Sequence, residues 1–245
     1  MYLADMNFWD IVRKQFLYKI KAYRGVYSSL MVIQILAILF SFLGTGMHGG
    51  GAGTISFEVR TYSSSVIIGF MMIWAFIISV IMTTKAYRYD DFTFITNRLT
   101  GHLSNILFLL FASMIGGITT FMADFLVKDF MMIMHSSQYV FIEAEPSLFG
   151  VLGAVLYLFL FSAFGYACGM LVQISRLFLI VIPLLMVGTS IITSFITGDM
   201  VTGVDVAGVF FDESSFMIFF MKVVLTALPL LAVVTYLSNK LEVRQ

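Results

Sequence analysis

The chain has 245 residues, of which 60% are hydrophobic and 11% are charged, and its mean hydropathy is +0.98. So apolar a composition is typical of an integral membrane protein and excludes an ordinary water-soluble domain. The 14 basic and 14 acidic residues balance. The chain therefore lacks the basic excess with which proteins bind nucleic acid, and nucleic acid is not an expected partner.

Residues 1–26 form a charged segment that precedes the first apolar run. Apolar residues recur there at helical spacing, and charged residues take the other side. The apolar side holds Phe8, Trp9, Val12, Phe16, Ile20 and Tyr23, and the charged side holds Asp10, Arg13, Lys14, Lys21 and Arg24. Lys19 falls within the apolar side, and we expect its ammonium to reach the headgroups. The pattern predicts an amphipathic interfacial helix on the inner leaflet, the alternative being an ordinary cytoplasmic lead-in.

Residues 27–245 contain six apolar segments of the roughly 20 residues that a helix needs to cross a bilayer. The six predicted spans are Tyr27–Gly46, Ser64–Thr84, Asn105–Val127, Leu148–Leu171, Leu177–Thr197 and Ser215–Leu237. All should be helices, because unpaired backbone groups are costly in hydrocarbon. The expected fold class is an all-α integral membrane protein in which these segments form one six-helix domain.

The basic residues outside the spans predict the orientation, because Lys and Arg collect on the cytoplasmic side. With the N-terminus inside, eleven of the 14 basic residues lie in cytoplasmic segments, Arg60 and Lys128 lie outside, and Lys222 lies within a span. We therefore expect a multi-pass protein of the cell membrane whose two termini both face the cytoplasm.

The first outer segment contains the glycine run GGGAG at Gly49–Gly53. A phosphate-binding loop would need a lysine and a following soluble helix, and this run has neither. We predict a flexible turn here.

The second and third spans are joined by the charged segment 85–104, which lies between two very apolar segments. Asp90 or Asp91 is the expected N-cap of a short helix, Arg98 falls in its last turn, and Gly101 should end it. Its apolar residues Phe92 and Phe94 also fit strand alternation, so periodicity leaves both structures open. We prefer a short helix that lies along the membrane surface.

Two features inside the spans concern packing and charge. Gly165 and Gly169 form a GxxxG pair, and Gly150 and Ala154 repeat that spacing, which favours close packing within the bundle over a dimer seam. Asp124 and Lys222 lie at similar depths and form a candidate intramembrane ion pair; the alternative is that Asp124 reaches the headgroups and Lys222 snorkels.

Catalytic motifs are absent from the sequence. It contains no phosphate loop, no HExxH pair among its three histidines and no GxSxG nucleophile elbow. The single cysteine, Cys168, offers neither an intramolecular disulfide nor a metal cluster. We therefore predict no catalytic, cofactor or metal site, and we do not expect an enzyme.

A basic amphipathic N-terminal helix, six spans with both ends inside and a charged segment after the second span together resemble the permease subunit of ABC-2 type ABC transporters. The resemblance implies a coupling helix near Tyr87–Gly101 that docks on a separate cytoplasmic ATPase subunit, which binds the ATP. In that docking Asp90, Asp91 and Arg98 would supply charge complementarity, and Phe92, Phe94 and Ile95 would be buried anchors.

The resemblance further implies a second permease copy, identical or related, facing the first across a pathway within the membrane lipids. Residues 198–214 would re-enter the membrane, the alternative being an ordinary outer loop. The leading hypothesis is a permease that exports an apolar or amphipathic compound such as a peptide, an antibiotic or a lipid. The others are a substrate-binding membrane subunit of a vitamin-uptake system, and a membrane scaffold or immunity protein that transports nothing.

Overall fold

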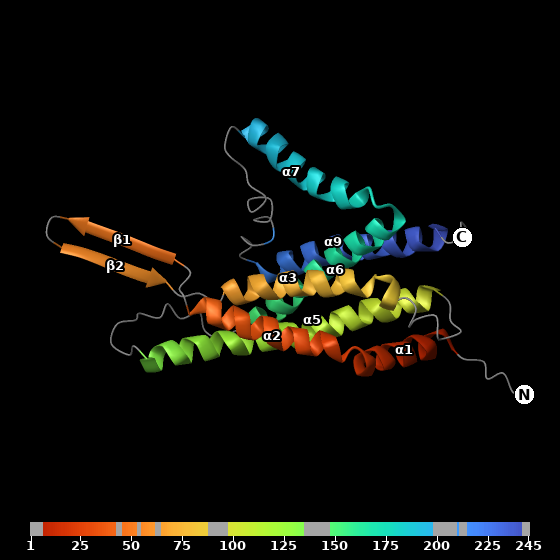
Figure 1. Ribbon diagram of the computed structural model, residues 1–245, viewed down its shortest axis with the longest axis horizontal. Helices are drawn as coiled ribbons and strands as arrows, with labels where there is room; N and C mark the ends of the chain where they lie inside the picture. The colour runs from red at the N-terminus through yellow and green to blue at the C-terminus, as the bar shows by residue number, and fades with distance from the viewer. Residues whose placement is uncertain are drawn as a thin grey trace, which may run out of the picture.

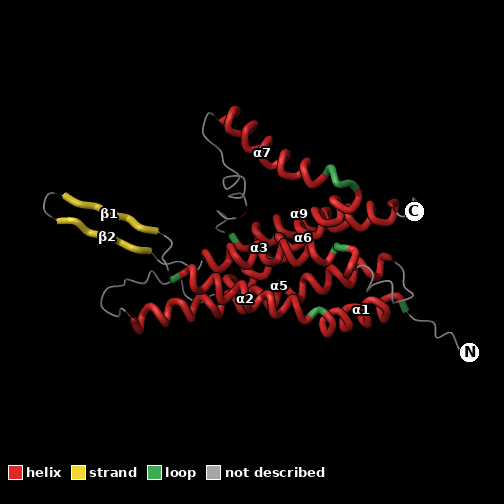
Figure 2. Tube along the Cα trace, in the orientation of Figure 1, coloured by secondary structure: helices red, strands yellow, loops and turns green. Residues whose placement is uncertain are grey.

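The computed structural model describes residues 7–42, 46–52, 55–61, 65–87, 98–134, 148–197, 210 and 215–241. Its elements, in chain order, are α1 (Phe8–Ala22), α2 (Arg24–Ser41), β1 (Gly46–Ala52), β2 (Ile55–Thr61), α3 (Ser65–Met82), α5 (Arg98–Met134), α6 (Leu148–Ile174), α7 (Phe178–Thr197) and α9 (Phe216–Leu241). Figure 1 shows most of the helices side by side in one elongated bundle, and Figure 2 shows how little of the described chain is strand.

The predicted membrane class is confirmed at the level of apolar helices. Within the part of the chain that the structure describes, four stretches are long and apolar enough to cross a bilayer: Arg24–Ser41, Leu99–Met131, Leu148–Gln173 and Phe216–Tyr236. A fifth, Val66–Met82 in α3, is apolar but shorter. Each of the six predicted spans overlaps a helix, so the apolar runs were sufficient to locate the helices.

The distribution of polarity across the helices also fits a hydrocarbon environment. On α5, Leu110, Met114, Ile118, Met122 and Leu126 are exposed at every fourth position. The buried side of the same helix contains polar residues, namely Ser104, Asn105, Ser113 and Thr120. An apolar outer stripe over a partly polar interior is typical of a helix that packs within lipid.

Helix α6 lies at the centre of the bundle and contacts α3, α5, α9 and α7. A Cβ at Gly165 would overlap Ser79 Oγ and the Phe76 carbonyl oxygen, and one at Gly169 would overlap the Thr83 side chain. A Cβ at Gly117 of α5 would lie 2.8 Å from the backbone nitrogen of Val155 in α6. The prediction that the GxxxG pair serves packing within the bundle is confirmed.

A β-hairpin stands between α2 and α3, where a flexible turn was predicted at Gly49–Gly53. Strands β1 and β2 pair antiparallel from Gly46 opposite Thr61 to Ala52 opposite Ile55. The turn prediction was wrong for residues 49–52, because the β-branched and aromatic strand ISFEVRT supplies a ladder that glycine can follow. Figure 1 shows the hairpin projecting from the bundle.

Helix α5 is longer than the predicted third span and corrects two expectations. It has 37 residues and a length of about 55 Å, whereas hydrocarbon is about 30 Å thick. Gly101, the predicted helix terminator, lies inside α5, and Arg98 is its first residue instead of lying in the last turn of an earlier helix. The helix continues through Gly101 because its first turns are packed against α1, and tertiary contacts override the weak local preference of one glycine.

The element ends that were predicted to be cytoplasmic gather at one end of the bundle, which we call the α1 end. It contains α1, the beginnings of α2 and α5, and the ends of α3, α6 and α9 (Figure 1). Helix α7 leaves the bundle there after the turn at 175–177 and diverges from its neighbours (Figure 1). Its described apolar side chains Leu179, Ile180, Leu184, Val187 and Ile191 are exposed.

Candidate functional site

The candidate site lies at the α1 end and is built on one buried stripe that runs through two helices. Val12, Gln15, Lys19, Tyr23 and Val26 are buried and follow each other at intervals of three or four residues, across the joint between α1 and α2. This spacing places them on one side of a helix. The stripe faces α5, so most of the apolar side that was predicted to lie on lipid packs on protein instead, whereas Trp9 of that side is exposed.

Lys19 is the charged member of this stripe, and only 1% of its surface is exposed. Its Nζ donates hydrogen bonds to Ser104 Oγ at 2.7 Å, to the Gly101 carbonyl oxygen at 3.4 Å and to Asn105 Oδ1. The expectation that Lys19 reaches the headgroups was wrong. Three ammonium hydrogens meet three oxygen acceptors, which offsets much of the cost of removing the charge from water.

The polar contacts continue from α5 into α6. Asn105 Nδ2 donates to the Tyr166 hydroxyl oxygen at 3.3 Å, and His102 Nδ1 lies 2.7 Å from the same oxygen. Tyr166 is 1% exposed. A single hydrogen-bonded network therefore joins α1, α5 and α6, and a displacement of one of these helices must strain or break it.

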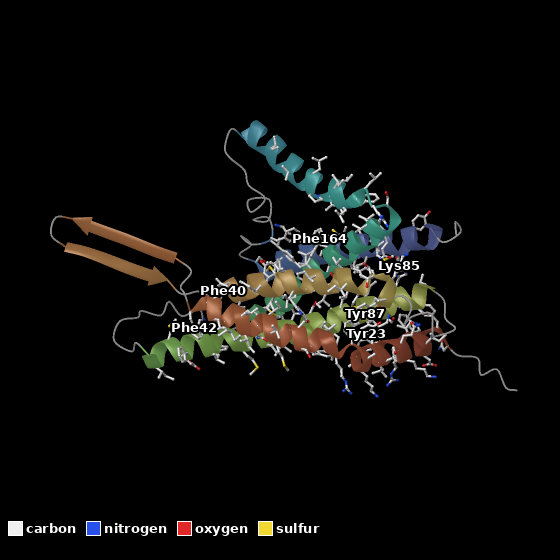
Figure 3. All side chains as sticks on the ribbon, viewed as in Figure 1. Tyr23, Phe40, Phe42, Lys85, Tyr87 and Phe164 are labelled. Carbon is white, nitrogen blue, oxygen red and sulfur yellow. The ribbon has the colours of Figure 1, made fainter. Side chains whose placement is uncertain are left out.

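An aromatic contact lies one helical turn beyond Lys19. The Tyr23 ring meets the Tyr87 ring edge-on, with centroids 4.7 Å apart, and meets the Phe108 ring of α5 at 5.6 Å. Tyr87 ends the short helical turn at 85–87 that follows α3. Figure 3 shows Tyr23 and Tyr87 next to each other beside the joint between α1 and α2.

Lys19 and Tyr23 belong to the same turn, because the Tyr23 backbone N–H donates to the Lys19 carbonyl oxygen at 3.0 Å. We call residues 19–23 the clamp turn. Through Tyr87 it holds the residue before segment 88–97, and through Gly101, Ser104 and Asn105 it holds the first turns after that segment. Both flanks of segment 88–97 are thus fixed to five consecutive residues.

The end of α3 is held from a second side. The Thr83 and Thr84 hydroxyls donate to the carbonyl oxygens of Val80 and Ile81, which caps the last turn of the helix. Gln173 of α6 donates through Nε2 to the Thr83 carbonyl oxygen. The chain therefore leaves α3 at a defined position before it enters the charged segment.

The predicted docking residues are only partly visible. Asp90, Asp91, Phe92, Phe94 and Ile95 lie outside the described residues, and their docking role stays a prediction. Arg98 begins α5, directly after the segment.

Lys19, Asn105, His102 and Tyr166 were not predicted as site residues. Lys19 on an apolar helix side was the available signal, but its spacing alone could not distinguish a lipid headgroup from a partner on another helix.

The candidate intramembrane charges give a mixed result. Asp124 forms an ion pair with Lys128, one turn further along α5, at 2.9 Å. Lys128 had been placed in an outer loop, but α5 continues past it to Met134. Helices α5 and α9 are in contact, and the pair between Asp124 and Lys222 stays a prediction.

One contact reaches the segment between α7 and α9, which was predicted to lie on the outer side. The Tyr157 hydroxyl of α6 donates to the Phe210 carbonyl oxygen at 2.7 Å, and Phe210 packs against the core. Tyr157 lies about 13 Å along the helix axis from the first residue of α6. The other residues between 198 and 214 lie outside the described part of the chain.

No protein-family model, curated protein or solved structure matches the chain. Within the described residues, no group of three or more His, Cys, Asp or Glu side chains is placed to hold a metal ion. The function is therefore inferred from the clamp turn, from the two flanks of segment 88–97 that it holds, and from the apolar helices.

Proposed function

We propose that this chain is the permease subunit of an ATP-driven transporter of the ABC-2 type. A separate cytoplasmic ATPase subunit docks on segment 85–104, binds ATP and supplies the energy, so the chain itself is not the enzyme. The chain crosses the cell membrane six times with both termini in the cytoplasm. It exports an apolar or amphipathic compound such as a peptide, an antibiotic or a lipid.

The anchoring of segment 88–97 is the observation that carries this proposal. Connecting loops are in general more mobile than the elements that they join. Here a buried ammonium and a buried aromatic ring of one turn hold the two flanks. Such anchoring suits a segment that must pass a displacement to the helices behind it.

The continuity of α5 supports the same mechanism. No helix break separates Arg98 from the apolar stretch Leu99–Met131. A movement imposed on the docked segment would therefore tilt α5 as a rigid body. The polar network through Asn105 and Tyr166 would carry part of that displacement to α6.

The position of α7 supports the second permease copy, identical or related. In Figure 1 this helix stands away from the bundle, and most of its described apolar side chains are exposed. An apolar surface against α7 would bury them. The contact between Tyr157 and Phe210 supports a re-entrant segment, because it fixes part of the outer connection against α6 well below the start of that helix.

Copurification tests the proposal. The chain is coexpressed with an ATPase that carries a phosphate loop and is encoded in a neighbouring reading frame, and the complex is isolated through a tag on the chain. We expect the two subunits in equal ratio. A variant with Phe92→Ala, Phe94→Ala and Ile95→Ala should lose the ATPase while still inserting into the membrane. Arg60→Gln, in the outer hairpin, is the control and should retain it.

The outcomes separate the competing functions. Association that survives the triple substitution would exclude docking on this segment. Ligand binding from the outer side by the chain without an ATPase would favour a substrate-binding uptake subunit. A chain that functions without any ATPase would be a scaffold or immunity protein.

A further inference from the structure

The outward side of α1 has a pattern of its own. Trp9, Arg13, Leu17 and Lys21 follow each other at every fourth position, and all four are exposed. Arg24 continues the row at the beginning of α2 and is exposed as well. We call these five residues the outer stripe of α1. It alternates aromatic or aliphatic side chains with cations.

The outer stripe is exposed because the opposite side of α1 packs on the bundle. Val12 and Lys19 are buried against the bundle, so most of the side of α1 that was expected to face lipid is covered, whereas Trp9 of that side stays exposed. Trp9 is 63% exposed and Leu17 is 45% exposed. Among the described residues, Arg13, Lys21 and Arg24 have no ion-pair partner, and Asp10 is the only acidic residue of α1.

The contacts of α1 place it at the edge of the apolar zone. Lys19 meets α5 at Gly101, before the predicted span, and Phe16 meets Phe111, which lies within it, with ring centroids 5.9 Å apart. From Gly101 to Phe111 the axis of α5 rises about 15 Å. A helix in contact with both levels lies at the depth of the headgroups and the first acyl carbons.

We propose that the outer stripe binds the headgroups of anionic phospholipids, with Arg13, Lys21 and Arg24 on the phosphates and Trp9 and Leu17 at the acyl boundary. Cations combined with an aromatic ring match both parts of such a lipid. An acidic protein surface would match the cations, but it would leave the exposed indole and leucine without an apolar environment. The proposal holds whether or not the chain is a permease.

Quenching of Trp9 fluorescence tests this proposal in reconstituted vesicles. The sequence has two tryptophans, so Trp74→Phe leaves Trp9 as the single reporter. Phosphatidylglycerol and phosphatidylcholine with brominated acyl chains are compared at equal mole fraction. We expect stronger quenching by phosphatidylglycerol, with each cation contributing a preference of roughly fivefold.

The triple variant Arg13→Gln, Lys21→Gln, Arg24→Gln should reduce that preference by more than tenfold, given roughly fivefold for each cation. The control is Lys85→Gln with Arg176→Gln, two exposed cations at the same end but outside α1, which should leave it unchanged. In the protein that keeps all three cations, raising the salt to about 1 M should also remove the preference for phosphatidylglycerol, because the Debye length then falls to about 3 Å.

Two results would overturn the proposal. Equal quenching by the two lipids at low salt would show that the stripe does not select anionic headgroups. A preference that persists in the triple variant would place the anionic site elsewhere. In either case an acidic protein surface would become the better candidate for the occupant of the outer stripe.

Discussion

Lys19 places a charged group inside the protein, where it is surrounded by acceptors from α5. Because both Ser104 and Asn105 are buried, loss of the ammonium would remove the donor to Ser104 Oγ and Asn105 Oδ1, whereas the Gly101 carbonyl oxygen would still accept from the Ser104 hydroxyl. We expect Lys19→Met to lower the free energy of unfolding by about 1–3 kcal/mol.

The measurement is thermal unfolding of the purified chain in detergent. Lys21→Met, two residues later and exposed, is the matched control and should change stability by less than about 0.5 kcal/mol. Equal melting temperatures for the two variants would contradict the network.

Glycines in α6 offer a comparison within one helix. Gly165→Ala would force a methyl group against Ser79 and the Phe76 backbone, and overpacking of this kind costs about 1–3 kcal/mol. Gly153 has no atom within 4 Å of the equivalent position. Gly153→Ala should therefore be neutral or stabilise by up to about 1 kcal/mol, through helix propensity.

Thermal unfolding in the same detergent compares the two alanine variants. The close approach of α3 and α6 would be disproved if Gly165→Ala were as stable as Gly153→Ala.

At the scale of elements, we expect the clamp turn to couple the docked segment 88–97 to the helices of the bundle, an expectation that depends on the proposed function. Tyr23→Leu keeps an apolar side chain but removes the edge contacts with Tyr87 and Phe108. Aromatic pairs contribute about 0.5–1.5 kcal/mol each, and loss of the contact with Tyr87, which holds the flank of the charged segment, should lower transport about two- to tenfold. ATPase association should be unchanged, because the docking residues themselves remain.

Transport into vesicles and copurification are measured on the same preparation. Tyr18→Leu, on an exposed part of α1, serves as the control and should transport normally. If Tyr23→Leu lost the ATPase, the clamp turn would be part of the docking surface and not a positioning element behind it.

At the scale of the whole molecule, the basic segments gather at the α1 end, and we therefore expect this end to face the cytoplasm and the hairpin to face the outside. In a Cys168→Ala background, a cysteine at Glu58 in the hairpin should react with a membrane-impermeant maleimide on intact cells. A cysteine at Lys85 should react only after permeabilisation. The orientation would be refuted if the cysteine at position 85 were labelled on intact cells, with or without labelling at position 58.

Much of the helical architecture could be predicted because local sequence decides it in lipid. An apolar run such as Leu148–Leu171 must satisfy its backbone internally, so length and hydropathy were enough to locate α6. The same reasoning failed at helix ends. Gly101 carries a local signal for a break, but α5 continues through it since neighbouring contacts outweigh a preference of about 1 kcal/mol. Lys128 marked the end of the apolar run, but lysine is a good helix former and α5 continues past it.

The sequence by itself determined the class of the protein, the positions of its helices and the contrast between basic and acidic segments, because hydropathy and charge act locally. Only the tertiary structure decided which side of α1 is buried and that residues 19–23 hold both flanks of the charged segment. These features depend on partners more than 60 residues away, such as Tyr87 and Ser104. The periodicity of a single helix records that one of its sides is covered, but not by what.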